Sequence, residues 1–228
     1  MTNTEIFLGI ITICVVLVTL NYFRTLSIET HGVGTFSIFS GKLSQGKKTL
    51  SNGVVEEGKF NIFSGRLIKG KKTGSNGVVQ EGKFDKRSGR LIKGKWTYIE
   101  GTVQEGNFLW DINWFFGKIT YPDGEVQEGG FDQITGFLNE GKITYPDGRI
   151  EEGKFDKDTG KLIEGKKTEP DGTIVEGKFD KDTGLLIEGK IIFPDGRISD
   201  GRFDKDLGIL IEGQRIDSNG TVEDYRFE

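Results

Sequence analysis

Residues 141–155 read GKITYPDGRIEEGKF, and close variants of this stretch return every 24 residues along much of the chain. The middle of the stretch is the triplet Pro146-Asp147-Gly148. Proline presets the backbone of the first turn position, and glycine accepts the left-handed backbone that closes a three-residue hairpin with a bulge. The stretch therefore predicts two short antiparallel strands joined by a tight turn.

Glycine follows two series along the chain, each with a period of 12 residues and one shorter step. The first series runs from residue 34 to 213 and predicts strand centres, whereas the second runs from 41 to 220 and predicts turns. Asn113 fills the single gap in the turn series, and asparagine tolerates the left-handed backbone. The chain has 35 glycines, 17 phenylalanines and no alanine, a composition that favours turns and strands over helices.

Pairing that is symmetric about each turn predicts which residues face each other on neighbouring strands. It places Phe155 opposite Ile163 and Phe179 opposite Ile187, as apolar cross-strand pairs. It also places two lysine pairs of like charge side by side, Lys59–Lys69 and Lys83–Lys93. The expected pairs of opposite charge are Lys47–Glu57, Lys71–Glu81, Lys95–Glu105, Lys118–Glu128, Lys142–Glu152, Lys154–Glu164, Lys166–Glu176, Lys178–Glu188, Lys190–Asp200 and Arg202–Glu212.

The N-terminal segment differs from the repeats. Residues 6–23 carry no charge and are long enough to cross a bilayer as a helix, with Tyr22 and Phe23 where interfacial aromatic residues belong. We therefore expect a transmembrane or signal-anchor helix within residues 1–23, followed by a linker over residues 24–33. A cleaved signal peptide fits less well because no basic residues precede the run, and a buried soluble helix is the remaining alternative.

The orientation of this anchor follows from the basic residues beside it. Arg24 and, further on, Lys42, Lys47 and Lys48 lie on the C-terminal side, whereas the N-terminal side has only the amino terminus and Glu5. Basic residues favour the cytoplasmic side, so a single-pass membrane protein with a cytoplasmic repeat region is expected. The single cysteine agrees with a reducing compartment. The sequon at residues 219–221 favours the opposite topology.

The repeats resemble the MORN family. Residues 141–155 look like its pattern Gly-x-x-Thr-Tyr-x-Asp-Gly-x-x-Tyr-x-Gly-x-Trp/Phe, and the similarity covers about residues 32–228. The second tyrosine of the pattern is replaced here, for example by Glu151 or Val175. The resemblance implies an elongated, single-layer antiparallel β-meander of MORN-like hairpin repeats over residues 34–228, in 24-residue units with one 23-residue unit at 108–131. It also implies a role as scaffold, membrane tether or appendage to an enzyme.

Catalytic chemistry is not indicated by the residues present. The one histidine, His31, falls in the linker, and no residues remain for a separate catalytic domain. The net charge of −4 argues against nucleic acid as the main partner. Turns such as Asp156-x-Asp158-x-Gly160 resemble the start of a calcium loop but lack its glycine and glutamate spacing. We therefore expect no enzyme activity, no cofactor and no metal site.

One segment departs from the repeat. All three tryptophans lie between residues 96 and 114, in the segment where the glycine period shortens to 11 residues. The segment is interpreted either as a bend or local packing cluster, or as a hot spot for a partner, because exposed aromatic residues dominate such sites. The candidate binding residues are Trp96, Tyr98, Phe108, Trp110, Trp114, Phe115 and Phe116.

The expected function is therefore that of a non-enzymatic scaffold. Residues 6–23 would hold it in the membrane, and the repeat surface would bind a protein or a lipid surface. The alternative is a secreted or surface-displayed, adhesin-like repeat protein with a cleaved or outward-facing N-terminal segment.

Overall fold

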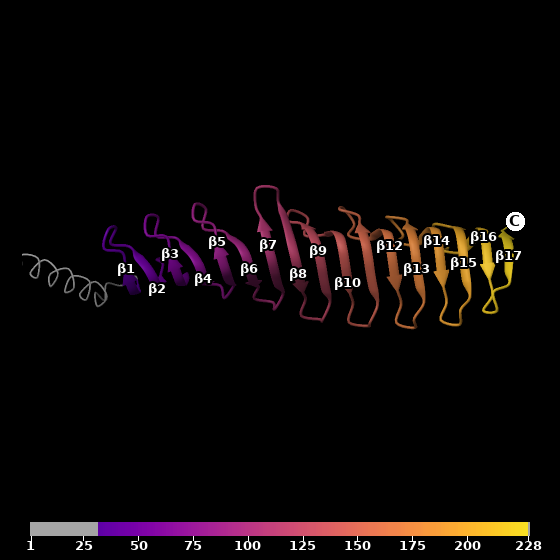
Figure 1. The fold of residues 1–228 in the computed structure, drawn as a ribbon, viewed down its shortest axis with the longest axis horizontal. Coiled ribbons are helices and arrows are strands. Elements are labelled where there is room, and N and C mark those ends of the chain that lie inside the picture. The colour runs from indigo at the N-terminus through magenta and orange to yellow at the C-terminus, as the bar shows by residue number, and fades with distance from the viewer. Residues whose placement is uncertain (1–31, 228) are drawn as a thin grey trace, which may run out of the picture. The chain divides into compact units, whose positions relative to one another are not determined.

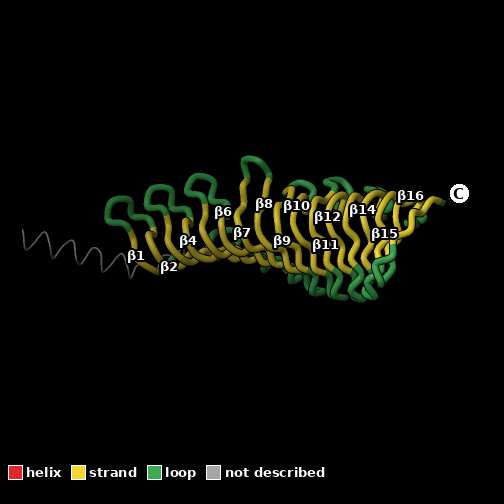
Figure 2. The backbone as a smooth tube through the Cα atoms, turned by 45° about the vertical axis from the view of Figure 1, so that its right-hand side comes forward, coloured by secondary structure: helices red, strands yellow, loops and turns green. Residues whose placement is uncertain are grey.

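The computed structural model describes residues 32–227, which form 17 strands and no helix (Figures 1 and 2). The chain divides into two compact units, with the boundary between Ile99 and Glu100. Within each unit consecutive strands pair antiparallel, so each unit is an open β-meander. No helix within residues 32–227 is long and apolar enough to span a membrane. The predicted anchor, residues 6–23, lies outside the described residues.

Strands in both units are five to seven residues long, except for the four-residue β1. The first unit contains β1 (Val33–Phe36), β2 (Leu43–Thr49), β3 (Val55–Phe60), β4 (Leu67–Thr73), β5 (Val79–Phe84) and β6 (Leu91–Thr97). The second unit contains β7 (Val103–Leu109), β8 (Trp114–Thr120), β9 (Val126–Asp132), β10 (Leu138–Thr144), β11 (Ile150–Phe155), β12 (Leu162–Thr168), β13 (Ile174–Phe179), β14 (Leu186–Ile192), β15 (Ile198–Phe203), β16 (Leu210–Ile216) and β17 (Val222–Arg226).

The Pro-Asp-Gly turns close as the sequence predicts. In the turn after β10, the Gly148 N–H donates to the Tyr145 carbonyl at 3.0 Å, and the Tyr145 N–H donates to the Arg149 carbonyl at 2.9 Å. Gly148 has φ +92°, which only glycine adopts readily. Asn113, the one substitute in the turn series, is the only non-glycine residue with positive φ among the described residues, at 52°.

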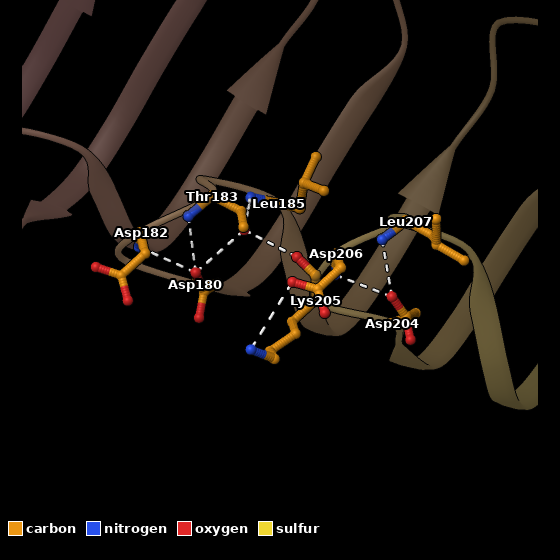
Figure 3. Close-up of polar contacts among 8 residues, drawn as sticks. All are labelled: Asp180, Asp182, Thr183, Leu185, Asp204, Lys205, Asp206 and Leu207. Carbon is orange, nitrogen blue, oxygen red and sulfur yellow. Dashed lines mark hydrogen bonds and ion pairs between the residues drawn. The ribbon is translucent and has the colours of Figure 1, made fainter.

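The alternate turns use aspartate as an internal acceptor, as Figure 3 shows for two stacked turns. Oδ1 of Asp180 accepts the N–H groups of Asp182 and Thr183 at 3.0 and 2.8 Å, and the Thr183 hydroxyl at 3.1 Å. These hydrogen bonds, led by the Thr183 N–H, lower the pKa of Asp180 below its ordinary value. The same hydroxyl approaches the Lys205 carbonyl at 2.9 Å, which ties one turn to the next. These aspartates therefore stabilise turns.

Glycine at the strand centres is required for a different reason. Gly153 of β11 faces Gly165 of β12, and both have φ +145°. A Cβ atom on Gly165 would lie 2.1 Å from the Glu152 carbonyl oxygen and 2.8 Å from the Gly153 Cα atom. Each such glycine pair therefore lets two neighbouring strands approach more closely than a side chain at either position would allow.

The predicted charge register is confirmed wherever both partners lie in one unit. Nine of the ten pairs of opposite charge are direct Cα partners, and so are both lysine pairs. The tenth pair, Lys95–Glu105, spans the two units and stays a prediction.

The predicted Phe–Ile pairs are wrong by one residue. Phe155 faces Leu162, because a β-bulge shifts the register after the Lys154–Glu164 pair and leaves Ile163 as the extra residue. The same bulge recurs between β13 and β14, where Phe179 faces Leu186 in place of Ile187. Leucine, and not isoleucine, is therefore the partner of each phenylalanine.

One face of the sheet, here called the core face, carries these phenylalanines and leucines. Phe155 and Leu162 are 4% and 1% exposed. Lysine side chains help to cover this layer: the Lys167 ammonium lies 4.7 Å above the Phe179 ring and donates to the Gly184 carbonyl at 2.9 Å. It also pairs with the buried Glu151 carboxylate at 3.6 Å. Long side chains thus protect the apolar layer of a single-layer sheet from solvent.

Candidate functional site

The opposite face carries exposed charges and is here called the ladder face. Residues on either side of each central glycine point to this face, since side chains alternate along a strand. In the second unit they form rows of alternating sign across successive strands. Lys154 meets Glu164 at 3.0 Å and Lys178 meets Glu188 at 2.9 Å. These pairs are largely exposed, so each contributes little stability and together they form a charge-balanced surface.

This row changes character between β8 and β10. Phe116 of β8 faces Gly130 of β9, and Gly130 faces Glu140 of β10. On the strands that follow β10, this row contains only charged residues. Phe116 is 44% exposed. The half-buried Trp114 lies two residues away on the same face, with its ring centroid 5.5 Å from that of Phe116. An aromatic pair therefore interrupts the charged row.

Gly130 provides the space for these two rings. A Cβ atom at this position would lie 3.0 Å from Cε1 of Phe116 and 3.2 Å from Cζ3 of Trp114. The equivalent position is Lys154 on β11, Lys178 on β13 and Arg202 on β15. Because residue 130 is a glycine, the two aromatic rings can lie close to the backbone of β9.

A shallow groove of about 590 Å³ lies beside the rings. We call it the Trp114 groove; it is lined by Trp114, Phe116, Gly117, Gly129, Gly130, Asn139, Glu140, Lys154, Phe155 and Ile163. The bulges of β10 and β12 position Asn139 and Ile163, because each is the extra residue that has no partner across the strand. The groove is therefore built from five neighbouring strands, β8 to β12.

The polar groups of the groove give it a defined chemistry. Oδ1 of Asn139 is shielded from solvent and accepts no hydrogen bond from any group in residues 32–227. An acceptor in this state favours a ligand that brings an N–H or O–H group. Glu140 and Lys154 face each other along one side, and the hydrogen bond to Glu164 raises the pKa of Lys154 above its ordinary value. The groove can hold an apolar side chain together with a hydrogen-bond donor.

The seven predicted binding residues do not form one cluster. Trp114 and Phe116 line the groove on the ladder face. Phe108 and Phe115 are both 3% exposed, and their tilted rings pack on the core face with centroids 4.8 Å apart. The Phe131 ring continues this layer, 5.4 Å from that of Phe115. They belong to the apolar layer and are not accessible to a partner.

The other three aromatic residues occupy separate places. Trp110 is half-buried and stacks on Phe108, with ring centroids 6.2 Å apart. Trp96 and Tyr98 lie in the first unit, where their rings stack at 5.4 Å and 7°. Trp96 faces Gln80, at the strand position that Lys72 occupies on β4.

Sequence reasoning missed Gly130, Asn139 and Ile163. Gly130 had a detectable signal, because it stands outside both glycine series. Asn139 and Ile163 had no signal in the sequence, since the face of the sheet to which each side chain points depends on a β-bulge. No group of three or more metal-ligating side chains occurs within residues 32–227.

Comparison with known proteins assigns no family to this chain. No protein family and no curated protein matches the chain. Among solved structures, the chain is similar to the TCP domain of SAS-4 (dCPAP) from Drosophila melanogaster, solved in complex with a proline-rich motif of Ana2 (dSTIL). The two share 14% sequence identity with a TM-score of 0.41, over 79% of this chain and 88% of the other.

Proposed function

We propose that this chain is a non-enzymatic interaction protein, a divergent MORN-like array anchored in a membrane by residues 6–23 with its repeats on the cytoplasmic side. The observation that carries the binding role is the Trp114 groove. There, an otherwise charged row is replaced by the exposed Phe116 ring, beside Trp114, an unpaired acceptor on Asn139 and a glycine that makes room for the rings. The partner is a protein segment that inserts an apolar side chain and donates a hydrogen bond.

The energetics of the groove support a binding role. A ring left 44% exposed forgoes part of the free energy that its burial would provide. Lysine and glutamate fill the same row in later repeats, so the fold itself does not require an aromatic residue there. Aromatic residues on a rigid sheet are also the side chains that dominate protein interfaces.

Phe116→Glu is expected to weaken partner binding by about 30-fold or more, the effect of losing an interfacial hot spot. The substitution restores a charge to the row, so the fold should persist, with an unchanged circular dichroism spectrum. Binding is measured by crosslinking in cells followed by quantitative capture of the partner. Ile134→Glu is the matched control, since Ile134 is an apolar turn residue of the same unit that is 76% exposed. Equal loss of capture in both variants would exclude the groove as the binding site.

The membrane topology has its own test. Protease added to sealed, right-side-out cells should leave the repeats intact, and digestion should follow only after the membrane is opened. Digestion of the repeats in sealed cells would support the outward-facing, adhesin-like alternative. Release of the intact chain by alkaline carbonate would exclude a membrane-spanning anchor.

A further inference from the structure

Glu140 lacks the cation that the other glutamates of its row have. Each of the others makes an ion pair with a basic residue of the preceding strand: Glu164 with Lys154 at 3.0 Å, Glu188 with Lys178 at 2.9 Å, and Glu212 with Arg202 at 3.5 Å. The residue that faces Glu140 from the preceding strand is Gly130, which has no side chain. Glu140 is exposed, and its carboxylate makes no ion pair within residues 32–227. The charged row therefore begins with an unpaired carboxylate.

The basic residue on the other side of Glu140 is engaged elsewhere. Lys154 of β11 faces Glu140, but its ammonium donates a hydrogen bond to Oε2 of Glu164 at 3.0 Å. The hydrogen bond and the charge of Glu164 raise the pKa of Lys154 most, and the charge of Glu140 contributes least. Lys154 therefore belongs to Glu164, and Glu140 stays open to a cation from outside the chain.

The bulge of β10 places a second acceptor beside this carboxylate. Asn139 is the extra residue of the bulge, so Asn139 and Glu140 both line the groove, although neighbouring side chains normally point to opposite faces. In β12, β14 and β16 the extra residue of the bulge is an isoleucine: Ile163, Ile187 and Ile211. An apolar side chain thus suits this position, and the shielded, unpaired Oδ1 of Asn139 is not required for folding.

Two aromatic rings complete the site. Strand β8 has no bulge, since its pairing with β7 continues without a shift from Gly117 to Trp114. Trp114 therefore points to the same face as Phe116. The centroids of the two rings lie 5.5 Å apart, and the ring planes are 21° from parallel. The face of an aromatic ring attracts cations, and the planar guanidinium of arginine stacks on it.

Gly130 brings these groups around one point. It is the direct partner of Phe116 on one side and of Glu140 on the other, across the neighbouring strands β8, β9 and β10 (Figure 1). Neighbouring strands are about 4.8 Å apart, so the ring and the carboxylate come from strands about 10 Å apart. No side chain of residue 130 fills the space between them. The groove of about 590 Å³ is large enough for a long side chain from a partner.

We propose that the Trp114 groove binds an arginine side chain of an extended protein segment. The inference rests on the proposed function and names the group of the partner that donates the hydrogen bond. The arginine lies over Gly130, where later repeats have a basic residue of their own. Its guanidinium stacks on the rings, pairs with Glu140 and donates to Oδ1 of Asn139. The five N–H groups of a guanidinium can serve both acceptors, whereas the ammonium of a lysine has no planar face to stack.

The test compares three labelled peptides on the full chain in neutral maltoside micelles, with binding measured by fluorescence anisotropy. The first peptide is Ser-Leu-Gly-Arg-Gly-Ser, in which leucine and arginine point to the same side of an extended chain. The second has citrulline, which is uncharged and has nearly the same shape, in place of arginine, and the third has lysine. We expect the arginine peptide to bind about 10-fold more tightly than the citrulline peptide, with the lysine peptide between them.

Variants of the two acceptors should change this binding in opposite directions. Glu140→Gln should weaken binding of the arginine peptide by about 10-fold and leave the citrulline peptide unchanged. Asn139→Asp should strengthen binding of the arginine peptide by about 5-fold, a gain that misfolding cannot produce. Glu212→Gln is the matched control, because Glu212 lies in the same row and the substitution makes the same change in net charge far from the groove.

Equal binding of the arginine and citrulline peptides would overturn the proposal, as would no binding of the arginine peptide or an unchanged affinity in Glu140→Gln. Competition by tetramethylammonium as strong as that by methylguanidinium would also overturn it and indicate a quaternary ammonium ligand. In cells, loss of partner capture in Phe116→Glu but not in Glu140→Gln would reject arginine and keep the groove as a binding site. Capture that persists in both variants would reject the proposed function itself.

Discussion

Gly165→Ala is expected to destabilise the second unit by roughly 4 kcal/mol or more, at the upper end of single-residue effects. Two costs combine at this position. The backbone has φ +145°, which an alanine adopts only with strain. The new Cβ atom would also lie 2.1 Å from the Glu152 carbonyl oxygen, and this backbone contact cannot be relieved by rotating a side chain. Strands β11 and β12 must separate, which breaks their hydrogen bonds. The effect is measured as the shift in the urea unfolding midpoint.

Gly148→Ala is the matched control. Gly148 also has positive φ, +92°, but a Cβ atom there would meet nothing within 4 Å. Only the backbone strain remains, so a loss of about 1–2 kcal/mol is expected. Similar losses for both variants would show that the strand-centre glycines are needed for conformation and not for close approach of the strands.

The sequence predicts the role of the turn glycines fully but that of the strand-centre glycines only in part. The turn series is predicted in full, including Asn113, because turn chemistry is local and depends on the backbone of a few residues. The strand-centre series is predicted only in position. Glycine is needed there because two strands approach closely, as at Gly153 and Gly165. The distance between two strands cannot be predicted from the sequence of either strand alone.

The faces of the sheet are predicted less well. Charge pairs such as Lys154–Glu164 follow from symmetry about the turn and are confirmed. The register beyond them fails because each bulge adds one residue, and an unpaired residue leaves no mark in a sequence with regular spacing. The error exchanges Ile163 for Leu162 in the core.

The candidate site shows the same limit. Its place in the chain is detected, because the tryptophans and the shortened period near Trp114 break an otherwise regular pattern. Its composition is not, because neighbouring residues such as Phe115 and Phe116 point to opposite faces, one buried and one exposed. Asn139 and Ile163 join the groove from strands outside the irregular segment. The groove spans five strands, so its lining can be predicted only once the pairing of those strands is known.

Leu162→Ala is expected to destabilise the second unit by about 2–5 kcal/mol, the usual cost of truncating a buried leucine. Leu162 is 1% exposed and lies opposite Phe155, so its removal leaves a cavity in the apolar layer. Rigid strand pairing on both sides limits how far the layer can collapse into that cavity. The measurement is again urea unfolding followed by circular dichroism.

Ile163→Ala separates the two possible registers. The bulge turns Ile163 toward the Trp114 groove on the other face, where it is half-buried, so its truncation should cost about 1 kcal/mol or less. The symmetric register of the sequence would reverse this order, with Ile163 the costly position and Leu162 the tolerant one. The ratio of the two losses therefore reports the bulge directly. If Ile163→Ala weakens partner binding while Leu162→Ala at matched folded fraction does not, the same pair of variants also ties the groove to function.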